Sequence, residues 1–342
     1  MLTPQQYLER LAAQSRTHHE AWWLRSEKTG TPESRRAKLR ATLSFHGQEH
    51  RAQSLEALLE ADPLTSDLSP ELRDVVEQTA KDLQEYVLPG EMATFQQMVF
   101  GLLPLAGVDA FCVDRTHDGD RLDGHLVVLN EGLFVCAQLL SKAFLLDNVE
   151  GDLEDYKRPG VDAYRNAIEH FLAPSGKHAN EVFFKDVPPE VEGLLSAAQM
   201  RMTILLLQFV MLHEVGHAVH GDHALMSEYR FHIAGAEQPP KATEKHWAAE
   251  YAADLYALER ILGHTGTNAG RWANFVAICS FFQWLAAVEK RIGSPLCPLH
   301  PPPLQRAAAL RTLLVGIVPL DDETGAQVEK SYEIFSSWGR QA

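Results

Sequence analysis

The residues with the clearest chemical meaning form the pattern His213-Glu214-Val215-Gly216-His217. In a helix, side chains four residues apart lie on one face about one turn apart, so both imidazoles could reach a single metal ion. Glu214 would lie beside them and could hold a water molecule bound to that metal. Two histidines and a glutamate at this spacing predict Zn2+ as the ion and Glu214 as a general base.

A catalytic zinc ion needs one more protein ligand. The first candidate is Glu250, in the segment Glu250-Tyr251-Ala252-Ala253-Asp254. A spacing of four places Glu250 and Asp254 on one helix face, and the small alanines between them would allow close approach to the first helix. Asp254 could then accept the free ring N–H of a ligating histidine and so fix its tautomer.

The second candidate for the third ligand is His223, six residues after the second histidine of the pattern. Metzincins use that spacing, and they need a glycine that lets the chain turn back toward the metal. His220 occupies the glycine position here and Gly221 comes one residue later, so we favour Glu250. His246, one turn before Glu250, is a weaker candidate.

The segments that carry these residues have helical patterns. Residues 194–220 lack proline, contain the apolar run Met202–Leu212 and are followed by Gly221, a residue favoured just after a helix. The run is roughly half of the ~20 residues that a membrane span requires, so it predicts a buried helix. Further helices are predicted at residues 70–86, 133–146, 163–172, 245–262, 272–292 and 304–315.

Two short β-prone segments precede the long helix. Residues 109–114 and 125–129 flank a polar segment that contains Asp118-Gly119, which predicts a strand pair. We expect residues 126–129 to form an edge strand that could bind an extended peptide by adding it to the sheet. The predicted fold class is therefore α+β, mostly helical, with a small β-sheet beside the helix that carries the two histidines.

The composition argues against several classes of protein. With 46 acidic and 31 basic residues the net charge is −15, which disfavours binding to nucleic acid or to anionic membranes. The four cysteines form no CxxC pair, and the N-terminal segment has no apolar signal-peptide core. We therefore expect a cytoplasmic protein with reduced thiols and no membrane span. GxSxG, P-loop and GxGxxG patterns are absent.

Taken together, HEVGH and the later EYAAD resemble the gluzincins, zinc metallopeptidases whose third ligand is a glutamate in an ExxxD helix. Residues 125–133 resemble the strand and helix start of the HtpX-type branch, and His300-Pro301 with Arg306 resembles its "HP…R" element. The resemblance extends over about residues 108–310. The chain is also similar to the Lit-like phage-exclusion peptidases, another soluble group.

This resemblance implies a zincin-like metallopeptidase domain, which we place at residues 91–342. The polar, helical pattern of residues 1–90 predicts a separate helical N-terminal region. Seven residues receive implied roles: His213, His217 and Glu250 as Zn2+ ligands, Glu214 as general base, Asp254 as support for a ligand, and His300 and Arg306 in the lining of the site. A histidine or arginine that faces the metal could stabilise the oxyanion of a tetrahedral intermediate. The expected activity is hydrolysis of peptide bonds in a peptide or protein substrate. The alternative is a non-catalytic metal-binding protein that regulates or binds a partner.

Overall fold

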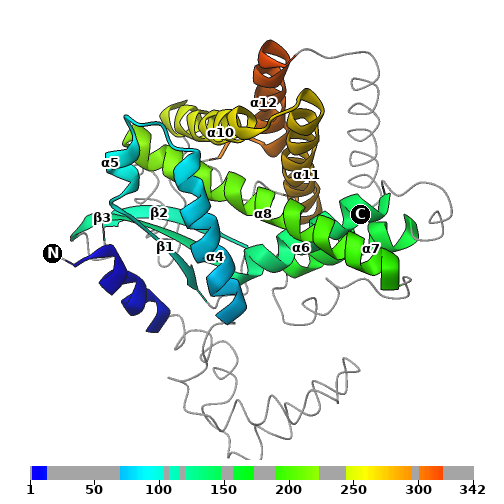
Figure 1. Ribbon diagram of the computed structural model, residues 1–342, viewed down its shortest axis with the longest axis horizontal. Helices are drawn as coiled ribbons and strands as arrows, with labels where there is room; N and C mark the ends of the chain where they lie inside the picture. Colours follow the sequence, from blue (N-terminus) through cyan, green and yellow to red (C-terminus); the bar gives the residue numbers. More distant parts are fainter. Residues whose placement is uncertain are drawn as a thin grey trace, which may run out of the picture.

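The computed structural model of the chain describes residues 2–13, 70–103, 108–115, 120–147, 157–172, 189–222, 244–293 and 300–318. Within these residues the fold is α+β and mostly helical, with a small three-stranded sheet, as predicted. The long helix α8 (Pro189–His220) runs through the centre of the molecule (Figure 1). The sheet lies on one side of α8, and on the other side lie three helices, which are α10 (Glu244–His264), α11 (Asn268–Ile292) and α12 (Pro303–Ile317).

The sheet has the strand order β1-β3-β2. β2 (Ala110–Arg115) pairs antiparallel with β3 (Arg121–Asn130), which confirms the predicted strand pair. β1 (Met98–Leu103) pairs with β3 in parallel, and this strand was not predicted. β3 is therefore the middle strand, with hydrogen-bonded neighbours on both sides of residues 126–129. The prediction of an edge strand there is wrong, because the backbone groups that would bind a peptide already pair within the sheet.

Helix α8 forms the middle of the hydrophobic core. No residue from Met202 to Val219 is exposed, because α8 packs against α10, α11, the sheet and α6 (Glu131–Asp147). By length and composition alone, α8 and α11 are apolar enough to cross a membrane. Core helices of globular proteins meet the same criterion, and 39% of the apolar window of α8 and 67% of that of α11 is buried inside the fold.

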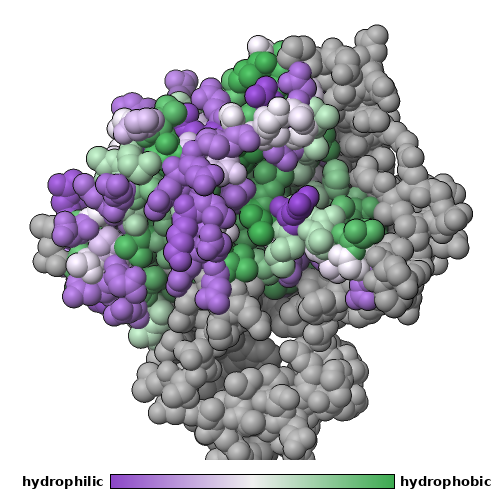
Figure 2. All heavy atoms as spheres, in the orientation of Figure 1, coloured by the Kyte–Doolittle hydropathy of each residue, from purple (hydrophilic) through white to green (hydrophobic). Residues whose placement is uncertain are grey.

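The described part of the N-terminal region packs onto this core. Helix α4 (Pro70–Asp82) continues into the short 3-10 helix η2 (Leu83–Glu85) and contacts β1 and α8. It buries Val76 against the core, whereas its outer face is hydrophilic in Figure 2. Residues 4–13 form a further helix that packs on the sheet, where Gly101 leaves room for the side chain of Leu8. The division of the chain at residue 90 stays a prediction.

Most predicted helices are present, with bounds that differ by a few residues. The segment predicted at residues 163–172 is longer and forms α7 (Lys157–Leu172), which packs against α6. The helix predicted at residues 245–262 is α10, which extends to His264. Cys112, Cys136 and Cys279 are free and buried, and Cys297 lies outside the described residues.

Candidate metal centre

The candidate site lies where α8 crosses α10. A Cβ atom added to Gly216 would lie 3.1 Å from the Cα atom of Ala253 and 3.3 Å from Cδ1 of Tyr256. The missing side chain at Gly216 therefore lets the two helix backbones come unusually close. Since Gly216 lies between the two histidines and Ala253 between the two acids of α10, this contact turns both sets of side chains toward each other.

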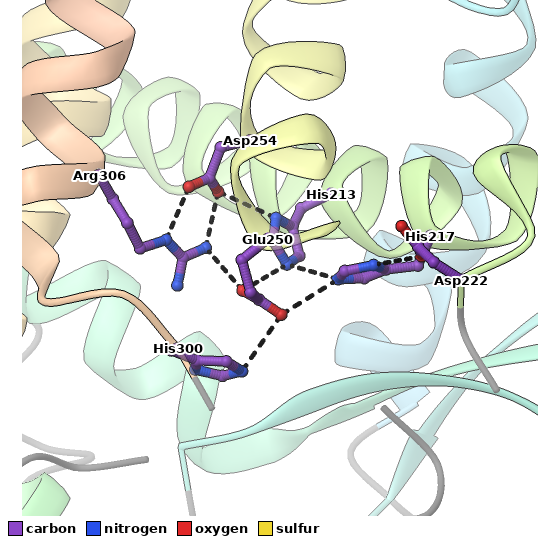
Figure 3. Close-up of polar contacts among 7 residues, drawn as sticks. All are labelled: His213, His217, Asp222, Glu250, Asp254, His300 and Arg306. Carbon is purple, nitrogen blue, oxygen red and sulfur yellow. Dashed lines mark hydrogen bonds and ion pairs between the residues drawn. The ribbon is translucent and has the colours of Figure 1, made fainter. Parts of the chain in front are cut away.

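Three donor groups converge at the crossing. The Nε2 atoms of His213 and His217 lie 3.1 Å apart. Glu250 places Oε2 3.5 Å from Nε2 of His213 and Oε1 3.4 Å from Nε2 of His217. Around a tetrahedral zinc ion with bonds of about 2.0–2.1 Å, neighbouring ligand atoms are about 3.3–3.4 Å apart. The observed distances are close to this length, with a different oxygen of Glu250 facing each ring, and one ligand atom from each of the three residues lies within 4.8 Å of the other two (Figure 3).

The second nitrogen of each histidine contacts a carboxylate. Nδ1 of His213 lies 2.9 Å from Oδ1 of Asp254, and Nδ1 of His217 lies 2.8 Å from Oδ1 of Asp222. An ionised carboxylate only accepts hydrogen bonds, so each Nδ1 carries the proton that it donates. In the neutral rings the lone pairs are then on Nε2, where they face each other and Glu250. This tautomer is the one that leaves Nε2 free to bind a metal ion.

Arg306 connects the two acids of α10. Its Nε and Nη2 atoms each donate to one oxygen of Asp254 at 2.6 Å, and Nη2 also lies 3.3 Å from Oε2 of Glu250. The guanidinium carbon lies 4.9 Å from the centre of the Phe282 ring, whose face stabilises the buried positive charge. Arg306 therefore fixes the positions of both carboxylates relative to α12.

His300 approaches the same cluster from the start of α12. Its Nε2 atom lies 3.3 Å from Oε1 of Glu250. The prolines at 301, 302 and 303 restrict the backbone between His300 and the helix, so this placement depends on a short stiff segment. The His300 side chain is 35% exposed, whereas those of His213, His217 and Glu250 are 10%, 3% and 0% exposed. Solvent thus reaches the cluster on the His300 side.

The electrostatic environment keeps the two acids of α10 ionised. Burial alone would raise the pKa of Glu250, but the positive charges of His300, Arg306 and His213 hold that pKa well below its usual range. Burial acts on Asp254 in the same direction, and the charge of Arg306 and its hydrogen bonds outweigh it and lower the pKa of this carboxyl. Both side chains are therefore anions inside the fold.

Several buried carboxylates surround the two histidines. Glu214, Glu250 and Asp254 are all buried, and Arg306 is the arginine that faces them. Burial lowers the pKa of His217, but the neighbouring carboxylates of Asp222, Glu250 and Glu214 outweigh burial and raise it to about 10. A positive charge is thus strongly favoured between the carboxylates, and a metal ion can supply it.

The carboxylate of Glu250 provides a direct test of whether a cation fits. Neither of its oxygens has a hydrogen-bond partner within the described residues, although the side chain is fully buried. Buried charges are paired or bound to metals, and the contacts of Glu250 are ion-pair contacts at 3.3 Å with Arg306 and at 3.3–3.5 Å with the imidazole nitrogens, between which a cation could bind. His213, His217 and Glu250 therefore fit a metal ion, and two imidazoles with one carboxylate are a ligand set that suits zinc.

The remaining predicted residues lie in different situations. Glu214 is buried on α8, close enough for its charge to raise the pKa of His217 and of Arg306. His223 lies outside the described residues. His246 is on α10 but does not belong to the group of converging donor atoms.

Asp222 is the residue of this cluster that the sequence reasoning missed. It follows Gly221, which was recognised as the end of the long helix. A helix-ending glycine commonly reverses the chain so that the next residue returns toward the last turn. An acid directly after such a glycine, five residues after a candidate ligand, is the signal that could have identified it.

Comparison with known proteins finds one family. Residues 188–316 match the model of the Peptidase U49 family. This match spans α8, α10 and α11 and nearly all of α12, and so includes every residue drawn in Figure 3. The comparisons with curated proteins and with solved structures find no match. The helices that build the site are thus similar to a peptidase family, which supports peptidase activity.

Proposed function

We propose that the protein is a zinc-dependent metallopeptidase of the gluzincin type, with a zincin-like core built around α8 and α10. The observation that carries this proposal is the convergence of the side chains of His213, His217 and Glu250 in one buried group, with contacts of 3.1, 3.4 and 3.5 Å between their donor atoms. The match of the site-bearing helices to a peptidase family supports hydrolysis of peptide bonds. A peptide or protein in the cytoplasm is the proposed substrate.

The three proposed ligands belong to the catalytic class of zinc site. Structural zinc sites use four protein ligands, whereas catalytic sites use three and keep one position for water or substrate. When bound, zinc would act as a Lewis acid that polarises a carbonyl group and makes water more acidic. His300 is the most exposed member of the cluster, so we propose that substrate enters on its side.

Glu214 is the proposed general base. It directly follows the proposed ligand His213 on α8, and it is buried near enough for its charge to raise the pKa of His217. Its carboxylate would accept a proton from the attacking water and later deliver this proton to the leaving amine. A purely structural metal site would have no use for a base at this position.

Arg306 and His300 receive different roles in this proposal. Arg306 is buried and donates to Asp254, so it would position the carboxylates and would not contact substrate. His300 is more exposed and places a ring nitrogen next to Glu250. It would therefore be available to donate a hydrogen bond to the oxyanion that develops on the scissile carbonyl.

The proposal is tested by comparing zinc content and peptide cleavage in the wild type and in Glu214→Gln. Glu214→Gln keeps the three ligands, so it should bind zinc as the wild type does. Its rate of cleavage of casein or of a peptide library should fall by about 10²–10⁴-fold, the range that general bases contribute. A chelator should abolish cleavage by the wild type, and added zinc should restore it.

Glu244→Gln is the matched control, because Glu244 is exposed at the start of α10 and lies outside the cluster. This variant should retain both zinc and cleavage. Undiminished cleavage by zinc-loaded Glu214→Gln would refute the assigned base. A wild type that binds zinc and cleaves no peptide would favour a regulatory metal protein.

A further inference from the structure

A positioning residue for one of the proposed ligands lies just beyond the end of α8. The side chain of Asp222 is 15% exposed, and its Oδ1 atom lies 2.8 Å from Nδ1 of the buried His217. We propose that Asp222 holds His217 in the tautomer and ring orientation that metal binding requires. This inference rests on the proposed function, since it takes the group of His213, His217 and Glu250 as the zinc site.

The conformation of the chain at Gly221 places the carboxylate of Asp222 next to the buried ring of His217. Gly221 has a φ of 72°, a left-handed conformation that residues with a side chain rarely adopt. The N–H of Asp222 then bonds to the carbonyl of His217 at 3.1 Å, and the N–H of Gly221 bonds to the carbonyl of Ala218 at 3.2 Å. This pattern of a reversed chain is typical of helix ends that stop at glycine. It returns Asp222 to the turn that carries His217 (Figure 3).

The backbone and the side chain of Asp222 therefore have separable roles. The hydrogen bond that closes the helix uses its backbone N–H, and every amino acid except proline could supply it. The carboxylate is a poor choice for the helix end itself, since the C-terminus of a helix already carries partial negative charge. The carboxylate instead accepts the hydrogen bond that Nδ1–H of His217 donates, and this makes Nε2 of His217 a better ligand.

Asp254 supports His213 in the equivalent way and serves as an internal comparison. Its carboxylate accepts from Arg306 as well, so its removal would also break a buried ion pair. Replacement of Asp222 avoids that complication, because it lies at the end of the helix and is partly exposed. A change at Asp222 should therefore affect metal binding more than it affects folding.

The first measurement is zinc affinity, determined by competition with a chromophoric chelator at neutral pH. Asp222→Ala removes the acceptor and should bind zinc about 10–100-fold more weakly than the wild type, the usual effect of losing such a partner. Asp222→Asn should show an intermediate loss, because the amide oxygen can still accept the Nδ1 proton but carries no charge. Asp74→Asn is the control for lost charge, because Asp74 is exposed on α4, and it should bind as the wild type does.

The second measurement is NMR of zinc-loaded protein with ¹⁵N-labelled histidine. The wild type should show slowly exchanging Nδ1–H signals for both His213 and His217, since both protons are hydrogen-bonded to carboxylates. In Asp222→Ala the signal of His217 should be lost to exchange with water, while that of His213 remains. A general loss of structure would remove both signals, so this readout separates positioning from folding.

Two results would overturn the inference. The first is zinc affinity in Asp222→Ala equal to that of the wild type, with the His217 signal retained. The second is equal weakening of both histidine signals in Asp222→Asn, which has nearly the size of the wild-type residue. A wild type that binds no zinc would refute the proposed function itself, and would do so before any variant is compared.

Discussion

The two histidines of the cluster are supported in different ways. His213 bonds to Asp254, which is fully buried on another helix and is held by Arg306 from a third. His217 bonds to Asp222, which lies five residues along the same chain and is partly exposed. We call the first arrangement the inner support (Asp254 and Arg306) and the second the outer support (Asp222).

Tertiary packing of three helices positions the partner of His213, whereas the local geometry of the chain positions the partner of His217. The inner support exists only when α8, α10 and α12 are packed together, so the folding of the core and the formation of this half of the site are coupled. The outer support needs only the end of α8 and the left-handed Gly221. We therefore expect changes to the inner support to affect stability and metal binding together, and changes to the outer support to affect mainly metal binding.

The largest expected effect is that of Arg306→Ala on the inner support. Removal of the guanidinium leaves Asp254 and Glu250 as buried anions without their cation, which should reduce the free energy of unfolding by about 3–5 kcal/mol. Zinc affinity should fall as well, because both acids lose their anchor to α12. Urea denaturation of the metal-free protein measures the first effect, and chelator competition measures the second.

The matched control for this variant is Arg165→Ala on α7. Arg165 also pairs with an aspartate, at 3.0 Å from Asp162, but its side chain is 51% exposed. Exposed ion pairs contribute little, so this change should cost less than about 1 kcal/mol. Equal urea midpoints for Arg306→Ala and the wild type would show that the inner support does not stabilise the fold.

A smaller effect on stability is expected for Gly216→Ala, which tests the close contact between α8 and α10. The added Cβ would lie 3.1 Å from Cα of Ala253, so α10 must shift and carry Glu250 away from the histidines. Overpacking of this kind reduces stability by about 1–3 kcal/mol. Zinc affinity should fall with it.

Gly193→Ala is the control on the same helix. A Cβ at Gly193 meets no atom within 4 Å, so the alanine should raise stability by about 0.5–1 kcal/mol through its better helix propensity. Its zinc affinity should be unchanged. If Gly216→Ala gained stability like Gly193→Ala and kept its zinc, the close crossing would not be what positions Glu250.

The smallest expected effect is that of Tyr256→Phe, at a part of α10 that belongs to neither support. The Tyr256 hydroxyl donates to Oε2 of Glu91 at 3.0 Å, and loss of this bond should cost about 1 kcal/mol. Burial raises the pKa of Tyr256 to about 12 from its ordinary value of 10.0. The folded state thus holds the phenol proton more tightly than the unfolded state does.

The stability that this proton contributes is present below pH 10 and is lost as the pH rises toward 12. The free energy of unfolding, measured by denaturation at several pH values across this range, should fall less steeply with pH for Tyr256→Phe than for the wild type. Zinc affinity should be unaffected at neutral pH. An equally steep loss of stability with pH in both proteins would contradict the raised pKa of Tyr256. Weaker zinc binding by Tyr256→Phe would mean that the metal site extends further along α10 than the two supports.

The parts of the site that depend on spacing within one helix could be predicted from the sequence, whereas the contacts between helices could not. The helical positions of His213, His217, Glu250 and Asp254 follow from spacing alone, because one turn of helix fixes which side chains share a face. The contact between Asp254 and Arg306 joins residues from different helices, and residue types alone did not indicate it. Arg306 and His300 entered the sequence-based prediction only through a family resemblance.

The errors in the fold have a similar cause. β1 was missed because its six residues contain Gly101 and no polar alternation, and without it β3 was interpreted as an edge strand. Its parallel pairing with β3 depends on contacts between distant segments. Asp222 is the opposite case, because its placement is local and was missed only because the turn after Gly221 was not followed to the next residue.

The most direct test of the account is an anomalous difference map at the zinc absorption edge from crystals of the zinc-loaded protein. The account predicts a single peak at about 2.0–2.2 Å from Nε2 of His213, Nε2 of His217 and one oxygen of Glu250. A peak that is bound by His223 in place of Glu250, or that lies away from the two imidazoles, would contradict it.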